Sequence, residues 1–128
     1  MSGTSLIAIV EDDESVRESI KMLIDSTGLE AQGFGSAEEF MDAGHLAGWS
    51  CLILDVMLPG KSGIDLQAQL NDLGFRIPII FITAHANDRT RKRAIQAGSL
   101  GFLEKPFTTE ALLNVLHLAM LDMENDDP

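Results

Sequence analysis

The stretch Cys51-Leu52-Ile53-Leu54-Asp55 decides the fold, because an unbroken apolar run ends abruptly in a carboxylate. Runs of this kind, rich in Ile and Leu, are typical of strands buried on both faces, as in a parallel sheet covered by helices. A carboxylate at the end of such a strand is costly to remove from water unless the site there needs its charge. Asp55 is therefore the first candidate functional residue.

Polar residues end three other apolar runs in the same way. The acids Glu11-Asp12-Asp13 follow residues 6–10, Thr83 follows residues 79–82, and Lys105 comes shortly after Phe102 and Leu103. In open α/β sheets, ligands bind beyond the carboxyl ends of the strands. We therefore expect these groups to converge with Asp55 in one site.

Apolar runs alternate with helix-period segments along the chain. The pattern predicts strands at residues 6–10, 30–34, 51–55, 78–82 and 100–103. It predicts helices at residues 15–27, from Ser36 onward, at 64–73, at 87–97 and at 109–122. The run 30–34 is the most polar, as expected of an edge strand. Gly28 and Gly98 are suited to close two of the helices, and Ser36 with Glu39 has capping-box spacing. Five strand–helix units in series predict a doubly wound α/β sandwich with right-handed crossovers.

Length and charge limit the classes of function. A chain of 128 residues is one domain with a sizeable core. Its net charge of −11 argues against direct nucleic-acid binding, which needs cations to displace phosphate counterions. No apolar run is long enough for a membrane span, and no signal peptide is visible. The single cysteine, Cys51, lies in a predicted buried strand and suits a reduced thiol, so we expect a cytoplasmic protein.

Over nearly its whole length the chain resembles the receiver domains of two-component response regulators. The residues that carry the resemblance are Glu11-Asp12-Asp13, Asp55 with Met57-Leu58-Pro59-Gly60-Lys61-Ser62-Gly63, Thr83-Ala84, and Phe102 through Lys105-Pro106-Phe107. Residues 34–40, 82–85 and 104–107 are similar to the FixJ-like subgroup. The resemblance implies a flavodoxin-like (βα)5 sandwich whose five parallel strands have the order 2-1-3-4-5. It assigns residues 1–122 to the receiver domain and residues 123–128 to an acidic tail or the start of a linker.

The resemblance also assigns chemical roles. Asp55 is expected to be the phosphoacceptor and to attack a phosphohistidine on a sensor histidine kinase or phosphotransfer protein. Lys105 is expected to pair with Asp55 at rest and with the phosphoryl oxygens afterwards, and the Lys105–Pro106 bond is expected to be cis. Thr83 would donate its hydroxyl to a phosphoryl oxygen. Such a domain catalyses its own phosphorylation and dephosphorylation but is not a classical turnover enzyme.

The acidic residues suggest a metal site. Clustered carboxylates raise one another's pKa unless a cation neutralises them, and hard oxygen ligands suit Mg²⁺ or Mn²⁺. By resemblance Asp12, Asp55 and the backbone carbonyl of Met57 bind the ion directly, while Glu11 acts mainly through water. Glu11 departs from the aspartate that the family more often has at this place. Asp13 is expected to begin the following helix.

The expected output is a change of surface. Thr83 and Phe102 would bias the face built from the fourth helix, the fifth strand and the fifth helix, through which a phosphorylated homodimer could form. Phe102 as an ordinary core aromatic is the alternative. The output is expected to be transcription control by a domain absent from this chain, with a stand-alone receiver acting as a phosphate shuttle or through protein contacts as the alternative.

Three further alternatives remain at this point. A flavodoxin-like cofactor binder would share the fold, but residues 11–13 are acidic where a phosphate-binding loop offers amides and hydroxyls. An aspartyl-phosphate hydrolase would carry a second acid where this chain has Met57. A basic cluster is either a solvated helix face or a docking patch for an acidic partner; it consists of Arg89, Arg91, Lys92 and Arg93.

Overall fold

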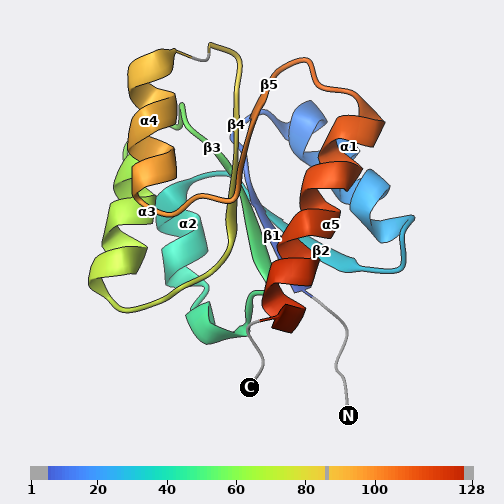
Figure 1. Ribbon diagram of the computed structural model, residues 1–128, viewed down its shortest axis with the longest axis horizontal. Helices are drawn as coiled ribbons and strands as arrows, with labels where there is room; N and C mark the ends of the chain where they lie inside the picture. Colours follow the sequence, from blue (N-terminus) through green and yellow to red (C-terminus); the bar gives the residue numbers. More distant parts are fainter. Residues whose placement is uncertain (1–5, 86, 126–128) are drawn as a thin grey trace.

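A five-stranded parallel sheet runs through the centre of the molecule and is covered by helices on both faces (Figure 1). The computed structural model describes residues 6–85 and 87–125. The strands are β1 (Leu6–Val10), β2 (Glu30–Phe34), β3 (Cys51–Asp55), β4 (Ile79–Thr83) and β5 (Gly101–Glu104). The helices are α1 (Glu14–Asp25), α2 (Ala37–Asp42), α3 (Gly63–Asp72), α4 (Asp88–Gln96) and α5 (Thr109–Asn125). The strand order β2-β1-β3-β4-β5 confirms the predicted fold, with β2 at an edge.

The two faces of the sheet contribute to two separate cores. Along β3, Leu52 and Leu54 face the core under α2, α3 and α4, while Cys51 and Ile53 face the core under α1 and α5. Successive strand residues point to opposite faces, so a strand between two helical layers must be apolar at every position. This is why the run 51–54 contains no polar residue, and why the carboxylate of Asp55 can appear only at its end.

Local capping follows the sequence in most places. Ser36 is the N-cap of α2, and its Oγ accepts a hydrogen bond from the Glu39 amide, as the capping-box spacing predicted. The Glu39 side chain departs from the motif, because its Oε2 accepts from the Gly35 amide at 3.3 Å and not from the amide of Ser36. Gly98 lies just beyond α4 with φ +102°, a conformation that glycine adopts without strain. Among the described helices, none is long and apolar enough to span a bilayer.

Two predicted helix ends were wrong, and one short element was missed. Helix α1 ends at Asp25 with Ser26 as its C-cap, so Gly28, at φ +91°, lies beyond the cap. A 3₁₀ helix at Leu46–Gly48 was not predicted, because so short an element has no periodic apolar signal. Helix α5 continues to Asn125, past the predicted boundary at residue 122, since Met and Glu favour helix. Residues 126–128 of the predicted tail lie outside the described residues.

Candidate functional site

Most predicted site residues lie at the carboxyl edge of the sheet, whereas Phe102 is the second residue of β5. Asp55 and Thr83 are the last residues of β3 and β4, Glu11 follows β1 directly, and Lys105 follows β5 directly. The register places Asp55 beside Ile82 on the neighbouring strand, so the two strands end within one residue of each other. Parallel pairing therefore brings together side chains that are far apart in sequence, as the apolar runs predicted.

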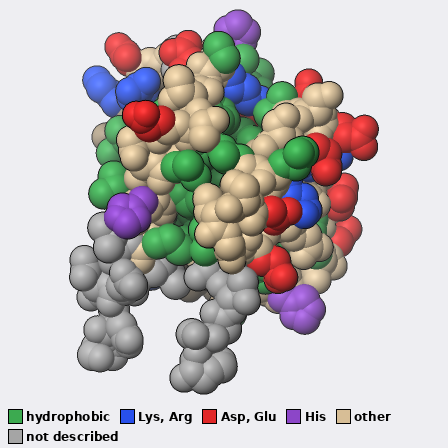
Figure 2. All heavy atoms as spheres, turned by 90° about the vertical axis from the view of Figure 1, so that its right-hand side faces the viewer, with side chains coloured by type: hydrophobic (Ala, Val, Ile, Leu, Met, Phe, Trp, Pro, Cys, Tyr) green, Lys and Arg blue, Asp and Glu red, His purple; other side chains and the backbone are tan. Residues whose placement is uncertain are grey.

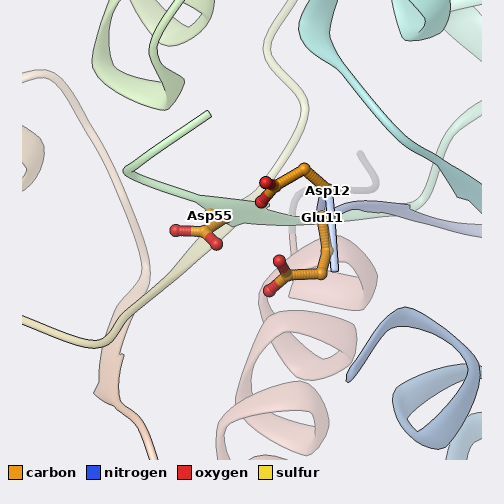
Figure 3. Close-up of side chains that lie close together, drawn as sticks. All are labelled: Glu11, Asp12 and Asp55. Atoms are coloured by element: carbon orange, nitrogen blue, oxygen red, sulfur yellow. The ribbon is translucent and has the colours of Figure 1, made fainter. Parts of the chain in front are cut away.

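Three carboxylates converge at this edge. Figure 3 shows the side chains of Glu11, Asp12 and Asp55 lying close together, and one oxygen of each lies within 4.8 Å of the others. Glu11 and Asp55 are only 1% and 3% exposed, whereas Asp12 is open to solvent. An all-oxygen set of this kind fits a hard divalent cation such as Mg²⁺. Asp13 lies apart from this cluster and caps α1, accepting a hydrogen bond from the Val16 amide at 3.2 Å.

Lys105 neutralises two of these carboxylates. Its Nζ donates to Asp55 Oδ2 at 2.9 Å and to Glu11 Oε1 at 2.5 Å. The ion pair of Lys105 with Asp55 was predicted, but its second ion pair, with Glu11, was not. Burial lowers the pKa of Lys105, but the hydrogen bonds to the two carboxylates outweigh it and raise that pKa overall. Burial, together with the nearby Asp55 carboxylate, raises the pKa of Glu11, although the hydrogen bonds from Lys105 and the Asp13 amide lower it.

The loop after β3 holds Asp55 from its other side. The Met57 amide donates to Asp55 Oδ1 at 2.9 Å, so both carboxylate oxygens are engaged. At the end of the loop, the Gly63 amide donates to the Val56 carbonyl at 3.0 Å. A Cβ atom on Gly63 would overlap the carbonyl oxygen of Asp55. The start of α3 therefore requires glycine because the backbone of the phosphoacceptor candidate passes directly against it.

Thr83 and Phe102 occupy different environments. Thr83 is fully buried, and its Oγ1 accepts a hydrogen bond from the His85 amide at 3.2 Å. Phe102 is half-buried, with its ring centroid 6.2 Å from that of Phe81, and the guanidinium carbon of Arg91 lies 5.2 Å from the Phe102 centroid. The ring is thus held between the core and a cation on α4. The Lys105–Pro106 bond is cis, as predicted.

The sequence also matches a known family. The response regulator receiver domain model matches residues 7–117. The chain belongs to this family. Nodulation protein W of Bradyrhizobium diazoefficiens is 44% identical over 115 residues, covering 90% of this chain and 51% of the relative. The transcriptional regulatory protein FixJ of Azorhizobium caulinodans is 34% identical, covering 89% of this chain and 54% of the relative. The receiver domain therefore spans about half the length of these relatives.

Solved structures agree with this assignment. The response regulator StyR superposes with a TM-score of 0.88 at 39% identity, covering 97% of this receiver domain and 63% of that chain. The FixJ-N crystal structure superposes with a TM-score of 0.81 at 30% identity, covering 93% of this chain and 95% of that one. The receiver domain is therefore FixJ-like and belongs to the two-component response regulators, a family distinct from the classical enzymes. Membership of this family favours neither of the two alternatives, a flavodoxin-like cofactor binder and an aspartyl-phosphate hydrolase.

An apolar groove adjoins the site between α1 and α5. It encloses about 600 Å³ and reaches Lys105 at one end. Its apolar lining is formed by Val16, Ile20, Leu23, Pro106, Phe107 and Leu112. Figure 2 looks onto this side of the molecule, where hydrophobic side chains gather between acidic ones. The receiver domain thus offers an apolar surface directly beside its buried carboxylates.

Two charged residues that the sequence analysis did not single out contact the loops of the site. Arg17 Nη1 donates to the backbone carbonyl of Glu11 at 2.8 Å. Glu38 Oε2 accepts from the Lys61 amide, in the loop after β3, at 3.1 Å. A sequence signal that bears on Arg17 is the glycine Gly33 inside the edge strand β2, which the sequence interpretation did not use.

Proposed function

We propose that Asp55 accepts a phosphoryl group from a phosphohistidine on a sensor histidine kinase or phosphotransfer protein. The observation that carries the proposal is a nearly buried carboxylate that is held by two donors and lies beside two further acids. An Asp55 oxygen attacks phosphorus, the phosphorus–nitrogen bond breaks, and the imidazole leaves with the electron pair. The product is an acyl phosphate on Asp55. The domain catalyses this transfer to itself, and later the hydrolysis, without acting as a turnover enzyme.

Lys105 and Thr83 are the groups that receive the phosphoryl oxygens. The Lys105 ammonium already lies 2.9 Å from Asp55 Oδ2, so a small movement transfers its hydrogen bond to the phosphoryl group. Thr83 Oγ1 accepts from the His85 amide, which leaves the hydroxyl proton available for donation. Stabilisation of charge by positioned donors is the main requirement of phosphoryl transfer.

The acidic cluster is the proposed Mg²⁺ site, and Mn²⁺ would suit the same oxygens. Asp12, Asp55 and the backbone carbonyl of Met57 are the direct ligands. Both Glu11 oxygens already accept hydrogen bonds, from Lys105 and from the Asp13 amide, which supports a role for Glu11 through water. A bound divalent cation supplies charge neutralisation for the carboxylate and the phosphoryl oxygens.

The groove between α1 and α5 is the proposed docking surface for the donor. An amphipathic helix lays its apolar face into such a groove, and this one ends at Lys105. A donor helix seated there would carry its phosphohistidine next to Asp55. Substitution of Val16 by Glu should therefore lower the rate of transfer from a kinase relative to the rate of labelling by a small phosphodonor.

Phosphorylation is proposed to alter the α4–β5–α5 face through Thr83 and Phe102. The new negative charge beside Thr83 draws the Thr83 hydroxyl toward the phosphoryl group. The side chain of Phe102 then moves into the space that Thr83 has left. The altered face is the proposed homodimer surface. The receiver domain itself is proposed to occupy residues 1–122. The proposed output is transcription control by a further domain beyond it. This output is supported by relatives that are named transcriptional regulatory proteins and are longer than this chain, which matches only 54% and 60% of their lengths. A stand-alone phosphate shuttle is the alternative.

The central test is direct labelling. The purified chain is incubated with a small phosphodonor and Mg²⁺, and intact mass is measured for wild type, Asp55→Asn and the control Asp72→Asn, which changes an exposed acid at the end of α3. We expect one phosphoryl group on wild type and on the control, none on Asp55→Asn, and none in a chelator. A label that persists in Asp55→Asn would overturn the assignment.

A further inference from the structure

Arg17 reaches from α1 across the carboxyl end of β1. Its Nη1 donates a hydrogen bond to the Glu11 carbonyl at 2.8 Å. The last backbone hydrogen bond between β1 and β2 lies at the same residue, where the Glu11 amide donates to the Phe34 carbonyl at 3.0 Å. Hydrogen bonds from a charged donor are shorter and stronger than neutral ones. A guanidinium therefore completes the hydrogen bonding of the strand at the point where the acidic residues begin.

The edge strand is shaped to admit this side chain. Glycine weakens a strand and often marks a close approach, and Gly33 lies inside β2. A Cβ atom at Gly33 would lie 2.9 Å from both Cγ and Cδ of Arg17, and one at Gly35 would lie 3.6 Å from Nη1. Both glycines thus border a slot that is filled by the arginine. The slot fixes the direction in which the guanidinium points.

The hydrogen bond from Arg17 acts on the orientation of two carboxylates. The Glu11 carbonyl belongs to the planar peptide group that joins Glu11 to Asp12, so fixing that oxygen fixes the plane. The Glu11 side chain has its own contacts with Lys105 and the Asp13 amide. Within residues 6–85 and 87–125, by contrast, no hydrogen bond is made to the Asp12 carboxylate. The peptide plane is thus the main restraint on the direction of Asp12.

We propose that Arg17 is a positioning residue for the divalent-cation site: by locking the Glu11–Asp12 peptide it sets the affinity of the acidic cluster. This inference rests on the proposed Mg²⁺-dependent function of that cluster. Removal of a group that orients a metal-binding residue commonly weakens metal binding by about 10- to 100-fold. Because Arg17 acts through the backbone, we expect a change near the lower end of that range.

The test compares Arg17→Met with Lys21→Met. Methionine keeps an apolar stem in the slot beside Gly33 but has no donor, and Lys21 lies on the same helix in an exposed pair with Asp25. Mg²⁺ binding is measured calorimetrically on the whole chain, together with the Mg²⁺ concentration for half-maximal labelling and the rate at saturating Mg²⁺. We expect the dissociation constant to rise about tenfold in Arg17→Met, with a smaller change in the saturated rate, and to stay near wild type in Lys21→Met.

The sign of the effect separates positioning from simple electrostatics. Loss of a positive charge near acidic ligands would by itself strengthen the binding of a cation. Unchanged or tighter Mg²⁺ binding in Arg17→Met, with the fold intact by thermal unfolding, would therefore overturn the proposal. If wild type binds Mg²⁺ but is not labelled, the proposed phosphoacceptor function fails while calorimetry still decides the role of Arg17.

Gly33→Ala tests the same idea without changing Arg17. The added methyl group displaces the arginine stem and should weaken Mg²⁺ binding in the same direction as Arg17→Met. Within 3.4 Å the added Cβ meets only atoms of Arg17. In the Arg17→Ala background, Gly33→Ala should therefore cause no further loss of Mg²⁺ affinity. Fully additive effects of Gly33→Ala and Arg17→Ala on Mg²⁺ affinity would contradict the slot mechanism.

Discussion

Replacement of Lys105 by methionine should destabilise the domain strongly in the absence of divalent ions. The ammonium lies between Glu11 Oε1 and Asp55 Oδ2, and both carboxylates are almost completely buried. Removing one partner of a buried ion pair costs about 3–5 kcal/mol, because the remaining charge stays desolvated. The Lys105 side chain is 20% exposed, so solvent relieves part of the loss. We therefore expect a decrease of about 3 kcal/mol in the free energy of unfolding, at the lower end of that range.

The assay is urea unfolding at neutral pH in a chelator, followed by the same measurement with Mg²⁺. The midpoint should fall without a change in the denaturant slope, because the surface exposed on unfolding is the same. Mg²⁺ should restore more stability to Lys105→Met than to wild type if it binds the folded state and replaces the missing positive charge. Adding Glu11→Gln to Lys105→Met should recover part of the loss, with a coupling energy above about 0.5 kcal/mol.

Lys21→Met is the matched control, because its pair with Asp25 is exposed and such pairs contribute little. Its unfolding midpoint should remain close to that of wild type. A midpoint for Lys105→Met that equals the wild-type value in chelator, or a loss that Glu11→Gln does not relieve, would refute the view of Lys105 as the neutralising cation of a buried acid pair.

Three further predictions concern single groups. Burial raises the pKa of Glu11 in the folded protein above its ordinary value of 4.5. The proton on Glu11 therefore stabilises the folded state fully below about pH 4.5, and this contribution is lost as the pH rises through the folded pKa. In chelator, Glu11→Gln should thus gain stability over wild type at neutral pH, with the gain shrinking toward pH 4.5 in urea unfolding. Burial also raises the pKa of Cys51 from 9.0 to about 12, so the folded protein should hold about a thousandfold less thiolate at pH 8 and resist iodoacetamide until it unfolds. Gly63→Ala should lower the free energy of unfolding by about 1–3 kcal/mol, because the methyl group overlaps the Asp55 carbonyl.

Each of these predictions has a sharp counter-result. A stability difference between wild type and Glu11→Gln that does not vary with pH would contradict the raised pKa. Rapid alkylation of the native thiol of Cys51 would contradict its burial. For Gly63→Ala the control is Gly48→Ala, where an added Cβ meets no atom within 4 Å; equal stability of the two variants would contradict the steric argument.

The sequence predicted the architecture because each level of structure left a readable pattern. The uniformly apolar run 51–54 indicated a strand covered on both faces, and the polar residues at the strand ends indicated which side chains meet. Strand order could not be derived from periodicity and came only from the family resemblance. Short elements such as Leu46–Gly48 carry no such pattern, and so they were missed.

Side-chain reach explains what the sequence could not predict in the site. That Lys105 is shared between Asp55 and Glu11 depends on the length of the Glu11 side chain and on the spacing of β1 and β3. The bond from Arg17 depends on the packing of α1 against β2, and Gly33 gave only a weak hint of it. Both contacts join residues whose distance in space is set by tertiary structure.

The ion pairs of Lys105 join distant parts of the chain. Lys105 contacts Glu11 across 94 residues and Asp55 across 50 residues. A chain still emerging from the ribosome therefore has no neutralised acid pair until β5 has docked on β4. A fragment cut between these strands likewise lacks the lysine. The neutralised acid pair thus forms only after the chain has been made and folded through β5, and under the proposed function a shorter chain would lack the lysine that contacts the phosphoryl oxygens.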